Sequence, residues 1–227
     1  MTKAAQGGAP SRREKRRQAI LDAARAVFLE QGYGATSLND IVSVSGGSLA
    51  TLYDLFDGKA GLFQEMIEQE CEDFFGGLRA EDLDEKPLRE ALRVVARQFF
   101  DGVIQQPKMS LLRVVVAEAP HFPEVGATFY RAGPERGRKM VSAYLGKQSQ
   151  RGFLEIDDPE RAADVFVALI IGEFQMKVLC GEDVRFPPEE VDRYLDYALD
   201  VFLKIYEHRR SGSETQDPSK RTGVSTS

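Results

Sequence analysis

The segment between residues 36 and 56 constrains the fold most, because it holds two short helical patterns separated by a glycine pair. Apolar residues recur at helical spacing on both sides of Ser45-Gly46-Gly47, first at Leu38, Ile41, Val42 and Val44, then at Leu49, Leu52, Tyr53 and Phe56. Glycine accepts the positive φ of a tight turn, and Ser37 and Ser48 suit the N-caps of the two helices. The pattern predicts a helix-turn-helix.

Helical periodicity also dominates the rest of the chain, and no stretch shows the alternation expected of a strand. Further helices are predicted at about 11–32, 58–67, 87–105, 108–119, 159–179 and 188–208, while Pro120, Pro123 and Gly133-Pro134 divide the region before Gly152 into shorter pieces. We therefore expect an all-α fold. Its predicted parts are a disordered arm at 1–10, a helix-turn-helix domain at 11–57, a larger helical domain at 58–209 and a disordered tail at 210–227.

Charge is distributed unevenly along this chain, whose net charge is −6. Residues 1–60 carry eight Lys and Arg against six Asp and Glu, which leaves the first part positive and the remainder negative. Five positive charges lie at the start of the first predicted helix, at Arg12, Arg13, Lys15, Arg16 and Arg17. Such a run is typical of a DNA-backbone contact, although many charge runs are only solvated faces.

Lys59 stands in the first turn of a predicted helix. The helix dipole disfavours a cation there by about 0.3–1 kcal/mol. A DNA phosphate beside Lys59 and the free N–H groups of that helix end would offset this cost. The alternative is a solvated surface lysine.

A long string of residues carries a family resemblance. It comprises Ile20-Leu21, Ala23-Ala24, Phe28, Gly32-Tyr33, Thr36-Ser37, Asp40-Ile41, Leu52-Tyr53, Phe56 and Lys59. From about Arg13 to Ile67 the chain thereby resembles the DNA-binding domain of the TetR family of regulators. A second string, from Arg113 through Ala119 with Phe122-Pro123-Glu124, Phe129-Tyr130 and Gly133-Pro134-Glu135-Arg136, resembles the C-terminal domain of AefR-like members.

The resemblance implies about nine helices: three that bind DNA, a fourth that links them to a ligand domain, and two last helices that pack against a second subunit. It implies DNA contacts from Ser37, Ser48, Leu49, Ala50, Thr51, Tyr53 and Lys59, to which the basic run adds Arg13, Arg16 and Arg17. The chain departs from the family pattern at Gly46-Gly47, Ala50, Asp54 and Leu55. These departures leave the base preference open.

The helix predicted at 159–179 is apolar around most of its circumference and must therefore be buried on more than one side. We predict a homodimer interface at Val167, Ile171, Val191, Leu195, Ala198 and Phe202, with ordinary monomer core as the alternative. A ligand pocket is predicted from Phe99, Met109, Arg113, Phe129, Phe166, Glu173 and Phe174. Simple core is again the alternative, with Arg113 paired to Glu118 or Glu173.

Several function classes find no support in this sequence. It has no nucleophile elbow, phosphate loop or metal-ligand cluster, and only two histidines, so we expect neither an enzyme nor a bound metal or cofactor. Cys71 and Cys180 are interpreted as buried thiols. No secretory signal or membrane span is recognised, which favours a cytoplasmic protein. The leading hypothesis is a repressor released from a palindromic operator by a small, largely apolar ligand. The alternative is a regulator controlled by a protein partner.

Overall fold

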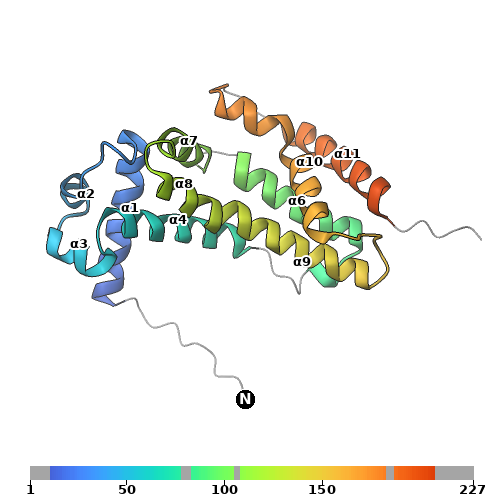
Figure 1. Ribbon diagram of the computed structural model, residues 1–227, viewed down its shortest axis with the longest axis horizontal. Helices are drawn as coiled ribbons and strands as arrows, with labels where there is room; N and C mark the ends of the chain where they lie inside the picture. The colour runs from blue at the N-terminus through green and yellow to red at the C-terminus, as the bar shows by residue number, and fades with distance from the viewer. Residues whose placement is uncertain (1–10, 78–82, 105–107, 183–186, 208–227) are drawn as a thin grey trace, which may run out of the picture.

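The computed structural model describes residues 11–77, 83–104, 108–182 and 187–207, and within them it is almost entirely helical (Figure 1). The helices are α1 (Arg12–Gln31), α2 (Leu38–Ser45), α3 (Leu49–Phe56), α4 (Lys59–Phe75), α6 (Leu88–Ile104), α7 (Lys108–Glu118), α8 (Pro123–Tyr130), the π-helical turn η1 (Arg131–Glu135), α9 (Arg136–Gln150), α10 (Pro159–Leu179) and α11 (Pro188–Tyr206). The all-α prediction is confirmed. The predicted arm at 1–10 and tail at 210–227 lie outside the described residues.

The molecule is elongated, with α1–α3 at one end of its long axis and α11 towards the other (Figure 1). A small core joins α1–α3 to the first half of α4, and Leu111, Val115 and Val125 of α7 and α8 complete it. A larger core lies among α6, α9, α10 and α11. Because α4 runs from the small core into the larger one, it connects the two parts of the protein.

The region from Pro123 to Gln150 is more continuous than the sequence predicted. Gly133-Pro134 was expected to divide it, yet α8, η1 and α9 follow one another without a loop. The chain makes one π-helical turn at this point, and Pro134 lies inside it. The wider turn accommodates a residue that cannot donate a backbone hydrogen bond.

Helix α10 is interrupted at Gly172, whose backbone adopts φ 49° and ψ −139°. The hydroxyl of Tyr194, on α11, donates a hydrogen bond of 2.6 Å to the carbonyl of Leu169, which the break exposes. The same hydroxyl occupies the place where a Cβ at position 172 would lie. The break therefore requires glycine.

Three arginines of α6 face three aspartates of α11, each set spaced by four residues. Arg89, Arg93 and Arg97 form ion pairs with Asp192, Asp196 and Asp200. We call these six residues the Arg–Asp network. It fixes the register of α6 along α11. Within the described residues, no helix is both long and apolar enough to cross a membrane.

Candidate nucleic-acid interface and cavity

The turn between α2 and α3 has the geometry that its glycines predicted. Gly46 and Gly47 adopt φ 74° and 89°. Ser37 caps α2 by accepting the Asp40 N–H at 3.2 Å, and its own hydroxyl donates to the Asp40 carboxylate at 2.6 Å. These hydrogen bonds lower the pKa of Asp40 below its ordinary value. Ser48 caps α3 in turn, through the Thr51 N–H.

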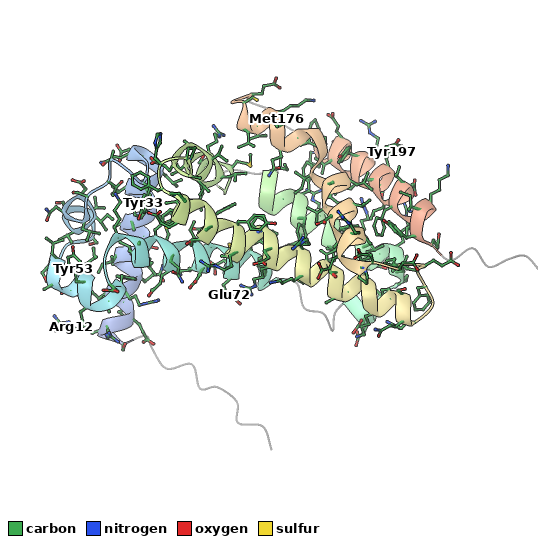
Figure 2. The ribbon with its side chains drawn as sticks, viewed as in Figure 1. Arg12, Tyr33, Tyr53, Glu72, Met176 and Tyr197 are labelled. Carbon is green, nitrogen blue, oxygen red and sulfur yellow. The ribbon has the colours of Figure 1, made fainter. Side chains whose placement is uncertain are left out.

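The N-terminal end of α3 is open to solvent. Ser48 and Ala50 are exposed, Leu49 and Thr51 are half-buried, and Tyr53 is 56% exposed. The opposite face of the helix packs into the small core through Leu52 and Phe56. Figure 2 shows Tyr53 at the extreme end of the molecule, with Arg12 on the same side. This end of α3 therefore projects from the surface, as is required of a helix that enters a DNA groove.

Most of the basic run makes contacts within the protein. Arg16 donates to the carbonyls of Ser45, at 3.0 Å, and Gly46, so its guanidinium stabilises the C-terminal end of α2. Arg17 pairs with Glu65 of α4, and Arg13 lies 3.7 Å from the Asp54 carboxylate. Arg16 and Arg17, both predicted to contact phosphate, are therefore engaged within the protein in this structure. Arg12 and Lys15 have no ion-pair partner among the described residues.

The pairing of Arg13 with Asp54 changes the charge that α3 presents to a phosphate. An unpaired carboxylate on α3 would repel phosphate, but Arg13 lies beside it. Both side chains are about three-quarters exposed, at 72% and 76%, so the pair is solvent-screened and weak. Arg13 is therefore the member of the run that exchanges its partner for a phosphate most readily.

Lys59 lies at the base of the helix-turn-helix rather than on its tip. Its ammonium donates to the Gly34 carbonyl at 3.2 Å and lies 4.5 Å from the centre of the Tyr33 ring. Burial lowers the pKa of Lys59 from its ordinary value, while the nearby Glu118 carboxylate acts in the opposite direction. Lys59 thus joins the loop between α1 and α2 to the start of α4.

The end of α7 and the start of α8 pack against this same loop. The Glu118 carboxylate lies beside Gly32, and its Oε2 is 3.1 Å from where a Cβ at Gly34 would be. The Phe122 and Tyr33 rings are 5.2 Å apart, edge to face. We call Gly32, Tyr33, Gly34, Lys59, Glu118 and Phe122 the junction. It is where the larger domain contacts the helix-turn-helix domain through α7 and α8.

A cavity of about 600 Å³ lies on the other side of these helices. It is bordered by α4, α6, α7, the α8–η1–α9 segment and α10 and is partly open to solvent, and aromatic and aliphatic side chains form most of its wall. Leu111 and Leu112 of α7 and Phe129 of α8 line it. Helices α4, α7 and α8 therefore each have one end at the cavity and the other at the junction.

The structure changes the set of residues predicted to line a pocket. Phe99 and Phe129 do line the cavity. Met109, Phe166 and Phe174 belong instead to the larger core, the first two with no exposed surface. Arg113 does not reach the cavity, and its buried Nε has no hydrogen-bond partner among the described residues. The side chain of Glu173 lies outside the described part.

Sequence reasoning missed several residues that line the cavity, among them Cys71, Phe74, Arg138 and Asp164. The apolar pattern of α4 indicated a buried helix but not that its far end borders a space. Cys71 is half-buried and Cys180 is exposed, so neither is the fully buried thiol expected. Within the described residues, no group of three His, Cys, Asp or Glu is placed to hold a metal ion.

The predicted dimer interface also requires correction. Val191, Leu195, Ala198 and Phe202 are buried in the core of their own chain. Val167 and Ile171 line the cavity. The apolar stripe of α11 was identified correctly, but it is the helix's inner face. The outward apolar side chains are Met176, Tyr197 and Ile205, each more than half exposed, and Figure 2 shows Met176 and Tyr197 along one outer edge.

Two family models match the chain, one over the helix-turn-helix end and one over the larger helical part. Residues 20–66 match the family described as bacterial regulatory proteins, tetR family, and residues 90–208 match the AefR-like transcriptional repressor C-terminal domain. The solved structure of the Flavonoid-responsive Regulator FrrA is 32% identical, with a TM-score of 0.76 over 86% of this chain and 98% of that one.

Two curated relatives extend the comparison. The HTH-type transcriptional regulator YvkB of Bacillus subtilis (strain 168) is 24% identical over 82% of this chain and 94% of its own. The HTH-type transcriptional repressor KstR2 of Rhodococcus jostii (strain RHA1) is 33% identical over 38% of this chain and 44% of its own. The chain belongs to the TetR family of DNA-binding transcriptional regulators and carries an AefR-like C-terminal domain.

Proposed function

We propose that the protein is a cytoplasmic, homodimeric repressor that binds a palindromic operator and is released from it by a small, largely apolar ligand. The observation that carries this proposal is the 600 Å³ cavity, whose walls continue through α4, α7 and α8 to the junction beneath the helix-turn-helix. A ligand acts only if it binds the released state more tightly than the DNA-bound state. A cavity bordered by these three helices gives it contacts that differ between the two states.

The outer face of α10 and α11 is proposed as the dimer surface. It presents Met176, Tyr197 and Ile205 to solvent, at 63%, 67% and 58% exposure. Exposed apolar side chains clustered on one face favour association. Twofold pairing through this face brings two copies of α3 to one side of the dimer, as palindromic half-sites require.

The names of relatives support both the response to a small ligand and the role as a repressor. FrrA is described as flavonoid-responsive, and KstR2 as a repressor. The cavity also favours a small-molecule effector over control by a protein partner alone, because such a partner does not need an internal space. Ser37, Ser48, Leu49, Ala50, Thr51 and Tyr53 remain the proposed DNA contacts, with Arg12, Arg13 and Lys15 at phosphates.

The test is binding of the purified protein to duplex fragments from beside its own coding region, measured by gel shift. We expect one fragment with a twofold-symmetric sequence to bind, and Ala50→Glu to weaken that binding by roughly tenfold or more through repulsion of phosphate. Glutamate in the first turn of α3 suits the helix dipole, so the fold is retained. Ala143→Glu, on the exposed side of α9, is the matched control. Equal affinity of both variants for the fragment would contradict the proposal.

A further inference from the structure

The cavity wall is unusually rich in aromatic rings. Phe74 is in edge-to-face contact with both Phe75, at 4.7 Å between ring centres, and Phe99, at 5.6 Å. All three line the cavity, and Phe129 and Tyr130 face it from α8. Such rings prefer offset or edge-to-face partners. A flat aromatic ligand therefore gains more binding free energy here than the burial of its surface alone provides.

Few charged groups interrupt this wall, and one of them already has a strong partner. The Glu70 carboxylate forms an ion pair with Arg25, whose Nε lies 2.6 Å from Oε1. Arg138 of α9 and Asp164 of α10 are the other two charges at the cavity, and their nearest nitrogen and oxygen are 3.8 Å apart. That separation exceeds a hydrogen bond. Neither side chain has a hydrogen-bond partner among the described residues, so the guanidinium donors and the carboxylate acceptor remain available together.

The charges at the cavity cancel in pairs, Glu70 with Arg25 and Asp164 with Arg138. An anionic ligand that approached Arg138 would also be repelled by Asp164. A cationic ligand that approached Asp164 would likewise be repelled by Arg138. A neutral group that accepts from the arginine and donates to the aspartate satisfies both. A hydroxyl has this capacity in a single atom.

Resting on the proposed function, we propose that the effector is a neutral, planar aromatic compound whose hydroxyl group binds between Arg138 and Asp164. The aromatic wall binds the ring system, and the Arg138–Asp164 pair selects compounds that carry the hydroxyl. The hydrogen bonds replace the loose 3.8 Å contact, so the ligand connects α9 to α10 across the cavity. The rings supply most of the affinity and the pair supplies the selectivity.

The experiment is calorimetric titration of the full-length protein with three probes: a monohydroxylated flavone, unsubstituted flavone and a flavone carboxylate. We expect the hydroxylated probe to bind about tenfold or more tightly than flavone, because a hydrogen bond to a charged group contributes that much. In Arg138→Met and Asp164→Leu, which remove the donor and the acceptor, this advantage falls to within about twofold, while the affinity for flavone itself is retained. Arg161→Met is the matched control, since Arg161 is an exposed arginine in the first turn of α10 and does not line the cavity.

Three outcomes would overturn the inference: equal binding of flavone and its hydroxylated form to the unmodified protein, tightest binding of the carboxylate, or no binding of any probe. Retained affinity for flavone shows that the variants are folded. The gel shift separates this inference from the proposed function. A protein that binds its operator but none of the probes disproves only the ligand class, whereas one that binds the hydroxylated probe but no DNA disproves only the repressor.

Discussion

At the scale of single residues, the turn of the helix-turn-helix depends on a close approach between Arg16 and Gly47. Gly47 has φ 89°, and a Cβ on it would overlap the guanidinium that holds the α2 carbonyls. The sequence showed that a glycine was needed here, because the spacing of two short helices demands a tight turn. It did not show that Arg16 fills the space, since a run of arginines at the start of a helix has the same appearance whether it binds phosphate or protein.

The first prediction concerns Gly47→Ala. The substitution places a Cβ at positive φ, which costs about 1–2 kcal/mol, and it also displaces Arg16 from the turn. Gly152→Ala is the matched control, because Gly152 has φ 77° and no atom within 4 Å of the added carbon. Urea denaturation should show a larger loss of unfolding free energy in Gly47→Ala than in Gly152→Ala. Equal losses would mean that Arg16 contributes nothing to the turn.

At the scale of elements, helical periodicity located nearly every helix but not which side of the chain each one faces. The stripe Val191, Leu195, Ala198 and Phe202 was visible in the sequence, yet the same pattern serves a dimer surface or an internal core. The continuity of α8 with α9 was not predictable either, because Gly133-Pro134 ends most helices and only the π-helical turn preserves this one. A pocket was predicted, but most of the residues that line it were not, because the space is formed by several elements together and no single pattern shows it.

The second prediction concerns the Arg–Asp network between α6 and α11. Asp196→Asn removes one partner from both Arg89 and Arg93. Since these side chains are about half exposed, we expect a loss of unfolding free energy below about 1 kcal/mol, diminishing at high salt. Glu190→Gln is the control, because this exposed glutamate of α11 has no ion-pair partner among the described residues. A salt-independent loss in Asp196→Asn would argue against an electrostatic role for the network.

The third prediction concerns the junction at the end of α7. Glu118→Gln removes the carboxylate beside Gly34 and Lys59 while preserving the length of the side chain. We expect near-normal affinity for the operator but a ligand-induced release weakened by about two- to thirtyfold, the range for residues that couple two sites. Anisotropy titrations of labelled operator, with and without the hydroxylated flavone, measure both quantities. Glu160→Gln, at the start of α10, should release normally, and an unaltered release in Glu118→Gln would remove the junction from the mechanism.

At the scale of the whole molecule, the DNA-binding end and the outward apolar face of α11 lie far apart along the long axis, as Tyr53 and Tyr197 show in Figure 2. The proposed DNA-binding end and the proposed dimer surface therefore occupy separate regions of the molecule. The family resemblance gave this division from the sequence alone. The particular residues of the dimer face did not follow from it, because the exposed positions of α11 are interspersed with charges.

The fourth prediction concerns that face. Tyr197→Glu places a charge on a side chain that is 67% exposed in the single chain, and we expect it to shift the protein from dimer to monomer in sedimentation analysis. Phe153→Glu is the control, since Phe153 is a similarly exposed aromatic residue in the turn after α9. The monomeric variant should also lose affinity for a palindromic site. A dimer that tolerates Tyr197→Glu would place the interface elsewhere.

The distance between the two α3 helices of the dimer is the quantity that tests the mechanism most directly. A spin label on Val44→Cys, an exposed residue of α2 that is not among the proposed DNA contacts, reports the separation of the twin helix-turn-helix motifs in a protein whose Cys71 and Cys180 are replaced by serine. On operator DNA we predict one distance near a helical turn of DNA, about 34–36 Å, and a shift away from it when ligand binds. A monomer, or twin labels held at a separation that one face of a duplex does not match, would contradict the account.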